Sequence, residues 1–172
     1  MSTIMLASGR YFDLRAPESC EIKIADIAHA LSNICRFTGH TREFYSVAQH
    51  SVLVSLAVPR VHAFAALLHD AAEAFVTDVS APLKALLPDY KRLEKQVQAA
   101  VFAHFGLPPE LPDCVKKADL VLLRTEQRDL MGAGADEWSV TRGIELLPDR
   151  IVPLPPHRAK HAFMARFDQV AP

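Results

Sequence analysis

Histidines and acidic residues interrupt the apolar segments of this sequence at spacings that suit metal-dependent chemistry. The stretch ALLHDAAEAFVTDVSAPLK, residues 66–84, places His69 and Asp70 at the end of an apolar run, and Glu73 and Asp78 follow within two or three helical turns. An ionised carboxylate that leaves water costs several kcal/mol unless a cation or hydrogen-bond donors compensate. These carboxylates therefore favour a functional site over an ordinary core segment.

Two other predicted helices also place a polar residue on their apolar face. These residues are His50 and Asp119. A single histidine on the apolar face of a helix is usually a hydrogen-bonded core residue, which is the alternative for His50. Their neighbours on the same faces are Val47, Ser51, Val54, Val115, Ala118 and Leu122. Within the third helix, positions 66, 69, 70 and 73 form one stripe. Two imidazoles and two carboxylates that converge make a site for one divalent cation, with Mn, Co, Ni, Fe, Zn and Mg as candidates.

The elements that must position these residues are predicted to be helices. Apolar residues recur at the three-four spacing of helices, and prolines and glycines separate the recurrent segments. The ranges expected to be helical are 24–37, 42–58, 61–75, 80–87, 89–106, 113–131 and 157–170. Residues 1–22 are expected to form an extended or hairpin-like lead-in, and residues 132–156 an irregular segment that could serve as a flap. We expect a single all-α domain over residues 1–172, a bundle of five to seven helices.

The composition narrows the class of protein. The chain has 172 residues, 50% of them hydrophobic, which is enough for one buried core. Nineteen Lys and Arg against 20 Asp and Glu give a formal net charge of -1, which argues against binding of long nucleic acid or of an anionic membrane. Three widely spaced cysteines without a CxxC pair predict reduced thiols, and no signal peptide or apolar run of membrane-spanning length is found. A cytoplasmic protein is therefore expected.

The order His, His-Asp, Asp is carried by the segments AQHS, LLHDAAE and KKAD. This order resembles the HD-domain superfamily of metal-dependent phosphohydrolases, over residues 24–131. The stretch HDAAEAFVTDVSAPLK is most similar to the small 5'-deoxynucleotidases and to phage triphosphohydrolases that act on dATP. The resemblance implies that the metal ligands are His50, His69, Asp70 and Asp119. It also implies that Glu73 and Asp78 handle the attacking water and the leaving oxygen.

Candidate substrate contacts come from the same resemblance. In the deoxynucleotidases an arginine followed by an aromatic residue precedes the first metal histidine and contacts the nucleotide. Here Arg36 and Phe37 stand 14 and 13 residues before His50, with phenylalanine in place of the usual tryptophan and a spacing about one residue shorter. Lys84 lies in a PLK segment that resembles the family's PVK. The alternatives are a surface Arg36, a Phe37 that packs at a helix end and a solvated Lys84; for Asp78 the alternative is a turn or cap before residues 80–84.

The leading hypothesis is metal-dependent hydrolysis of phosphate from deoxyribonucleoside 5'-phosphates. The alternatives are release of triphosphate from dATP or another deoxynucleoside triphosphate, and a non-catalytic nucleotide-binding HD module. Hydrolysis of a cyclic nucleotide or of ppGpp is a further possibility that the short chain disfavours. The family likeness implies a small-molecule nucleotide as partner and a homodimer or higher homo-oligomer.

Overall fold

This computed structural model describes residues 2–132 and 138–172 of the chain. These residues form eight α-helices and one small β-hairpin, joined by turns and irregular segments. The helices are α1 (Ile24–Asn33), α2 (Val47–Leu56), α3 (Ala63–Leu67), α4 (Glu73–Val76), α5 (Ala81–Ala85), α6 (Pro88–His104), α7 (Asp113–Leu130) and α8 (Pro156–Val170). The expected all-α class is confirmed. The number of helices exceeds the predicted five to seven because the segment 61–75 is divided between α3 and α4.

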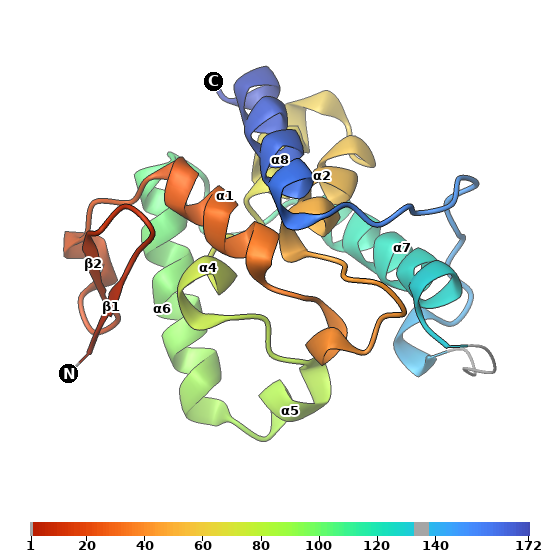
Figure 1. Cartoon of the computed structure of the whole chain (residues 1–172), viewed down its shortest axis with the longest axis horizontal. Helices are drawn as coiled ribbons and strands as arrows, with labels where there is room; N and C mark the ends of the chain where they lie inside the picture. Colours follow the sequence, from red (N-terminus) through yellow and green to blue (C-terminus); the bar gives the residue numbers. More distant parts are fainter. Residues whose placement is uncertain (1, 133–137) are drawn as a thin grey trace.

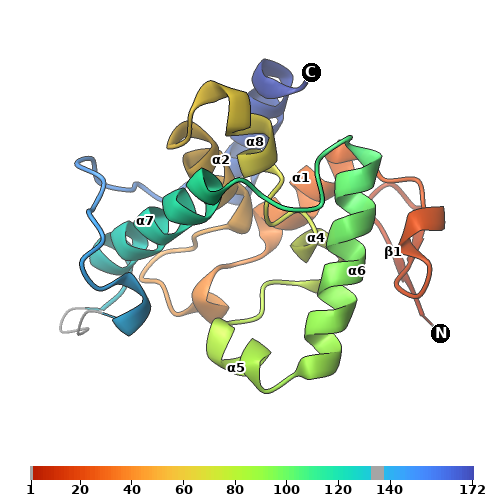
Figure 2. The same cartoon turned by 180° about the vertical axis from the view of Figure 1, so that it is seen from behind.

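Helix α2 lies at the centre of the helical assembly and contacts α1, α3, α7 and α8 (Figure 1). Contacts on several sides explain why most of its residues are buried, namely Val47, Ala48, Gln49, His50, Ser51, Val54 and Ser55. The N-terminal hairpin and α6 lie on one side of the molecule and α7 on the other, as both views show (Figures 1 and 2). The four polar residues of α2, Gln49, His50, Ser51 and Ser55, are therefore all buried against protein.

The lead-in is a β-hairpin, as the sequence predicted. Strands β1 (Thr3–Met5) and β2 (Tyr11–Asp13) pair antiparallel, with Ile4 opposite Phe12. The Phe12 side chain is fully buried and stacks on Phe75 with 4.0 Å between ring centroids. This contact attaches the hairpin to the core beside α4.

Helix α2 begins at Val47, five residues later than the predicted start at residue 42. The Ser46 hydroxyl caps the helix by accepting a hydrogen bond from the Gln49 backbone N–H at 3.2 Å. Before this cap the chain is held in another way, because Cys35 and Ser46 form an antiparallel β-bridge and the Arg36 backbone N–H donates to the Tyr45 carbonyl at 2.9 Å. The prediction for residues 42–46 was wrong because this pairing competes with helix formation.

The predicted helix over residues 61–75 is also corrected by the structure. Arg60–His62 forms a 3-10 turn, α3 covers Ala63–Leu67, and residues 68–72 form turns before α4 begins at Glu73. The four positions 66, 69, 70 and 73 are therefore not one stripe of a regular helix. A side chain of α6 forms hydrogen bonds to backbone groups in this break. Local periodicity cannot reveal such a distant contact.

The remaining helices agree with the predicted ranges to within a few residues. Helix α6 begins at Pro88, and no side chain caps it, so Asp89 is not the cap that the sequence predicted. Gly106 follows the end of this helix with a φ of +67°. In α5, Ser80 occupies the N-cap position without a side-chain hydrogen bond, and a proline stands in the first turn.

Residues 138–155 are irregular apart from a 3-10 turn at Ser139–Thr141, and positions 133–137 of the expected flap lie outside the described residues. Hydrogen bonds anchor the later part of this segment to the helices. The Leu154 backbone N–H donates to Gln49 Oε1 at 2.8 Å, and the Ile151 backbone N–H donates to Asp129 Oδ2 at 2.9 Å. The segment is thus fixed to α2 and α7 at its C-terminal end.

Candidate metal centre

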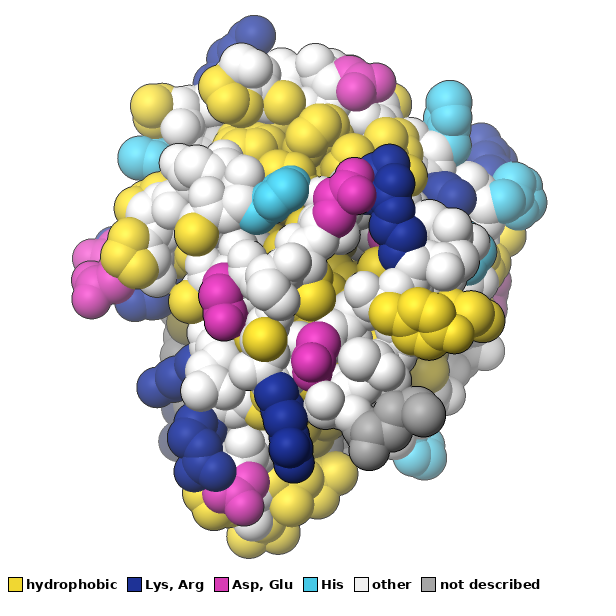
Figure 3. Space-filling view, turned by 90° about the vertical axis from the view of Figure 1, so that its left-hand side faces the viewer, with side chains coloured by type: hydrophobic (Ala, Val, Ile, Leu, Met, Phe, Trp, Pro, Cys, Tyr) yellow, Lys and Arg dark blue, Asp and Glu magenta, His cyan; other side chains and the backbone are white. Residues whose placement is uncertain are grey.

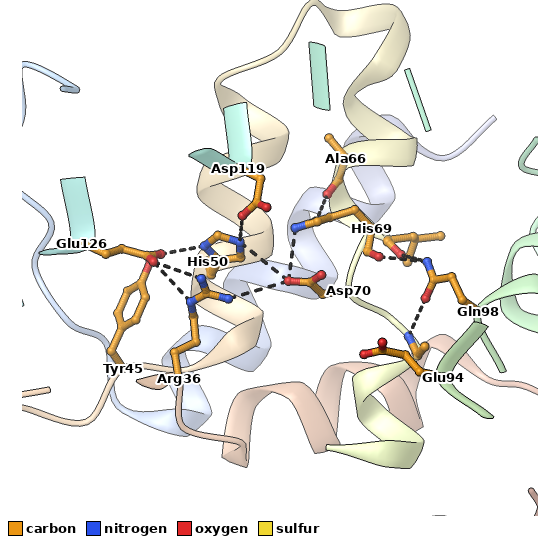
Figure 4. Close-up of polar contacts among 12 residues, drawn as sticks. Arg36, Tyr45, His50, Ala66, His69, Asp70, Glu94, Gln98, Asp119 and Glu126 are labelled. Carbon is orange, nitrogen blue, oxygen red and sulfur yellow. Dashed lines mark hydrogen bonds and ion pairs between the residues drawn. The ribbon is translucent and has the colours of Figure 1, made fainter. Parts of the chain in front are cut away.

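His50 lies on α2 with its side chain fully buried (Figure 4). Its Nδ1 is 2.6 Å from Glu126 Oε1, and its Nε2 is 3.1 Å from Asp119 Oδ1. An ionised carboxylate only accepts hydrogen bonds, so the contact with Glu126 places a proton on Nδ1. The Nε2 atom can then present its lone pair to a cation once it carries no proton.

His69 lies in the break between α3 and α4 and reaches the same point from another direction (Figure 4). Its Nδ1 donates to the Ala66 carbonyl at 2.8 Å, because a carbonyl oxygen can only accept. This leaves Nε2 as the free ring nitrogen. Both histidines therefore direct Nε2 to the same region, and each Nδ1 is held by an acceptor.

Two carboxylates complete the cluster. Ligand atoms of His50, His69 and Asp119 lie within 4.8 Å of one another. Asp70 borders this group, with Oδ2 3.1 Å from His69 Nε2 and 3.7 Å from His50 Nε2. The four residues predicted as metal ligands are thus brought together by α2, by the break before α4 and by α7.

The chemistry of this cluster fits a divalent cation. The Nε2 atoms of His50 and His69 are buried and make no hydrogen bond, although each has a carboxylate oxygen at 3.1 Å. A cation between the rings and the carboxylates would satisfy both nitrogens. Two imidazoles with two carboxylates suit Mn, Fe, Co, Ni and Zn better than they suit Mg, which prefers oxygen ligands.

The pKa values of His50 and of Asp70 are shifted by the charged groups around them. Burial and the Arg36 charge lower the pKa of His50, but Glu126 and Asp119 outweigh them and raise this pKa to about 9. Burial raises the pKa of Asp70, yet the neighbouring His69 outweighs it and holds the pKa below its usual range. The metal-free cluster is therefore an imidazolium beside ionised carboxylates, and a cation would take the place of the imidazolium proton.

Glu73 and Asp78, the predicted acid–base pair, both lie near the cluster. Glu73 is 7% exposed, and its Oε2 is buried without a hydrogen bond. Burial, followed by repulsion from Asp70 and Asp78, raises the pKa of Glu73 well above its usual value. Burial is also the main cause that raises the pKa of Asp78. The Asp78 carboxylate hydrogen-bonds to none of the residues that the structure describes, so the alternative role as a cap of α5 finds no support.

Arg36 is buried rather than a surface charge, which removes one of its alternatives. Its guanidinium donates to Glu126 Oε2, with Nη2 at 3.1 Å, and Nη1 lies 3.7 Å from Asp70 Oδ2. Phe37 is half-buried, with the Arg36 guanidinium 5.3 Å from its ring centroid and Trp138 at 5.8 Å. Phe37 has a φ of +55°, a region that non-glycine residues rarely adopt and that often marks functional sites.

Lys84 lies on α5 at a pocket of about 240 Å³ that adjoins the cluster. The pocket is lined by His69, Asp70, Ala72, Glu73, Lys84, Glu94, Lys95 and Gln98. Lys84 Nζ is 2.5 Å from Glu94 Oε1, so this lysine is held by an ion pair beside Glu73 rather than freely solvated. Acidic and basic side chains are interspersed over the face shown in Figure 3, in keeping with the near balance of charges.

Sequence reasoning missed two residues that support the cluster. Glu126 on α7 is fully buried and accepts hydrogen bonds from Arg36, His50 and, at 2.8 Å, from the Tyr45 hydroxyl. The pattern contained a signal for this glutamate, because Glu126 follows Asp119 by two helical turns on the buried face of α7. Tyr45 gave no such signal, because the sequence placed it within the predicted helix 42–58, whereas in the structure it precedes α2.

Similarity to known proteins places the chain in a family. No family model matches the sequence. The chain is 48% identical over 172 residues to the uncharacterized protein YfdR of Escherichia coli strain K12, an alignment that covers 99% of this chain and 97% of YfdR. It is 36% identical over 184 residues to the uncharacterized protein RCAP_rcc00048 of Rhodobacter capsulatus, an alignment that covers 94% of this chain and 91% of RCAP_rcc00048.

Neither name states an activity, so the substrate, the homo-oligomer and the cytoplasmic location stay predictions. Helices long and apolar enough to cross a membrane are absent from the described ranges. At these identities and coverages, the chain belongs to the family of YfdR and RCAP_rcc00048.

Proposed function

We propose that the protein is a divalent-metal-dependent phosphohydrolase of the HD type that acts on deoxyribonucleoside 5'-phosphates. The observation that carries the proposal is the convergence of His50 and His69 Nε2 on Asp119 and Asp70. Both Nε2 atoms are buried and make no hydrogen bond, and a cation between the rings and the carboxylates would satisfy both of them. The restriction to deoxyribonucleotides rests on the sequence resemblance.

A divalent cation held by these four residues would activate water as a nucleophile and neutralise charge on the phosphoryl oxygens. The protein's own contribution begins with Glu73. Its raised pKa means that the metal-free protein keeps this carboxyl group protonated to a higher pH than an exposed glutamate, and the charge of a nearby cation would favour the ionised form, which can accept a proton. Its buried Oε2 has no other hydrogen bond to satisfy. Glu73 is therefore suited to orient the attacking water and to take its proton.

The sequence resemblance assigns Asp78 the opposite task, since the pKa values of both carboxyl groups are raised and do not distinguish the two roles. Its pKa is raised chiefly by burial, so the carboxyl group keeps its proton to a higher pH than an exposed aspartate does. A protonated carboxyl group near the cluster can protonate the sugar oxygen that leaves. In the proposed reaction Glu73 gains a proton and Asp78 loses one, and exchange with water restores both.

Arg36, Phe37 and Lys84 would receive the nucleotide. Arg36 and Lys84 place positive charge on two sides of Asp70 and Glu73, where phosphate oxygens would lie. The half-buried Phe37 ring offers a flat apolar face for the base or the sugar. A sugar packed closely there would leave a ribose 2'-hydroxyl no room and no hydrogen-bond partner, which favours the deoxy form.

A second candidate is release of triphosphate from dATP or another deoxynucleoside triphosphate. The observation that favours it is the pocket of about 240 Å³ beside His69 and Asp70, which Lys84 and Lys95 border. Such a pocket has space for further phosphate groups, and its two lysines lie beside three acidic residues, Asp70, Glu73 and Glu94. A third candidate, the non-catalytic nucleotide-binding module, keeps the site without turnover.

A product assay separates these candidates. The metal-loaded protein is incubated with dAMP, dGMP, dATP, dGTP, AMP and ATP, and the phosphate species are separated. Inorganic phosphate from the deoxymonophosphates is the expected result. Triphosphate from dATP would favour the second candidate, and no turnover with any metal would favour the third. Equal rates with ribonucleotides would remove the deoxy preference and leave the metal chemistry in place.

Matched variants assign the activity to the centre. Asp119→Ala should abolish turnover, whereas Asp113→Ala, in the first turn of the same helix and exposed, should not. Activity that survives Asp119→Ala would show that the hydrolysis arises elsewhere.

A further inference from the structure

The break between α3 and α4 leaves several backbone groups without backbone partners among the described residues, and two of them concern the site. The backbone of Leu68 to Ala72 forms turns with hydrogen bonds between residues three positions apart, such as the bond from the Ala71 N–H to the Leu68 carbonyl at 3.1 Å. Over the described ranges, no backbone group bonds to the His69 carbonyl or to the Ala72 N–H. Buried backbone groups of this kind need partners, and here a single side chain provides them.

Gln98 on α6 bonds to both groups (Figure 4). Its Oε1 accepts from the Ala72 N–H at 3.1 Å, and its Nε2 donates to the His69 carbonyl at 2.8 Å and to the Leu68 carbonyl at 3.4 Å. These partners fix the orientation of the carboxamide, because the oxygen must accept and the nitrogen must donate. The side chain therefore spans the turn that carries His69 and Asp70.

The turn carries two of the four ligands of the proposed metal centre. In a continuous helix His69 and Asp70 would project about 100° apart around the axis. In the break, Asp70 Oδ2 lies 3.1 Å from His69 Nε2, so both groups reach one point. This geometry depends on the backbone of residues 68–72, and Gln98 is the side chain that holds that backbone.

We propose that Gln98 is a positioning residue of the metal centre: through the His69 carbonyl and the Ala72 N–H it holds the turn that directs His69 and Asp70 at the cation. The inference rests on the proposed metal centre and extends it to a residue on a separate helix. Among the described residues the hydrogen bonds of the Gln98 side chain all go to backbone groups, so its effect on the ligands passes through the backbone. Residues that hold metal ligands in place without binding the metal typically weaken metal affinity by about 10–100-fold when they are replaced.

The test compares Gln98→Glu with Gln96→Glu by titration of the metal-free proteins with Co²⁺. Glutamate has the shape of glutamine and can still accept from the Ala72 N–H, but it sets a carboxylate oxygen against the His69 carbonyl. Gln96 is exposed on the same helix and provides the matched control. The visible absorption of bound Co²⁺ reports the number and geometry of its ligands, which a general loss of stability would not change.

Gln98→Glu should bind Co²⁺ about 10–100-fold more weakly than wild type, with an altered visible spectrum, while Gln96→Glu matches wild type. Equal affinity and an equal spectrum in the two variants would overturn the role of Gln98. Failure of the wild-type protein to bind Co²⁺ would instead overturn the metal centre itself.

Hydrogen exchange in the wild-type protein provides a measurement that needs no variant. The Ala72 amide should be protected from exchange, although its partner is a side chain. Rapid exchange of this amide in the folded protein would contradict the proposed hold on the turn, whatever the variants do.

Discussion

Glu126 Oε1 lies 2.6 Å from His50 Nδ1, and the same buried carboxylate accepts hydrogen bonds from Arg36 and Tyr45. One residue therefore fixes the ring of a proposed ligand and neutralises the arginine beside it. Burial raises the pKa of Glu126, but Arg36 and His50 outweigh this effect and lower it. The carboxylate stays ionised, which keeps the proton on Nδ1 and leaves Nε2 for the cation.

Glu126→Gln should weaken metal binding by about 10–100-fold, because the orientation of His50 is no longer fixed by a charge. The variant also leaves Arg36 without its closest carboxylate, and a broken buried ion pair costs about 3–5 kcal/mol. Isothermal titration and denaturant unfolding measure the two effects. Tyr45→Phe is the comparator, since it removes one hydrogen bond and keeps the carboxylate; it should cost about 1 kcal/mol and leave metal affinity nearly unchanged. Equal metal affinity in both variants would speak against the role of Glu126.

Glu73→Gln should lower turnover by about two to four orders of magnitude while the protein keeps its metal. Without metal, the same change should stabilise the protein at neutral pH. The folded-state pKa of Glu73 is raised above its usual 4.5, so ionisation of the carboxyl opposes folding at pH values above 4.5. The gain in unfolding free energy should be about 1–3 kcal/mol at pH 7 to 8 and should vanish towards the usual pKa.

Thermal unfolding of the metal-free proteins across this pH range checks the second part. Glu110→Gln, a change at an exposed glutamate, should leave both turnover and stability as they are. If Glu73→Gln keeps near-normal turnover, Glu73 belongs to the structure rather than to the chemistry.

Metal binding should strengthen with pH. His50 must lose its Nε2 proton before it binds a cation, and Glu126 and Asp119 outweigh burial and Arg36 to raise its pKa to about 9. Below that pH the apparent affinity should rise about tenfold per pH unit, the slope for release of one proton. Titration calorimetry in two buffers with different ionisation enthalpies counts the released proton. Constant affinity between about pH 7 and 8.5 would show that His50 is already neutral without metal.

Phe37→Ala should raise KM for the nucleotide and change kcat much less. A base stacked on an aromatic ring contributes about 1–3 kcal/mol, which corresponds to roughly 5- to 150-fold in KM. Phe44→Ala is the matched control, since Phe44 is an exposed phenylalanine that contacts neither Arg36 nor Trp138 among the ring contacts of the described residues. A similar KM in the two variants would place the nucleotide away from Phe37.

Periodicity predicted most of the helices and the inward position of His50, because both are local properties of the sequence. The assignment of four residues as metal ligands came from the family resemblance. The buried face of α2 was expected from Val47, His50 and Val54, and all three side chains are fully buried. Asp119 was expected on the same face as Leu122. Leu122 is buried, whereas the Asp119 side chain is 41% exposed and reaches His50 Nε2 with Oδ1 at 3.1 Å. Such patterns indicate which residues face the core, and the packing of α2 against α3 and α7 brings the predicted ligands close together.

The same periodicity failed where distant side chains decide the backbone. Residues 61–75 have a helical pattern, yet Gln98 bonds to the turn at residues 68–72 from about 30 positions away, and no local rule includes it. Glu126 differs, because its place two turns after Asp119 was visible in the sequence. Its partner Arg36 stands 90 residues earlier, and this separation hid the ion pair until the fold joined them.

Metal stoichiometry tests the central claim most directly. The metal-free protein is dialysed against Mn²⁺ or Co²⁺, and bound metal per chain is measured by elemental analysis for wild type, His69→Ala and His62→Ala. We predict one ion per chain in wild type and in His62→Ala, and none in His69→Ala, because His69 supplies one of the two converging Nε2 atoms. A wild-type protein without bound metal, or a His69→Ala variant that keeps its full ion, would contradict the proposed centre.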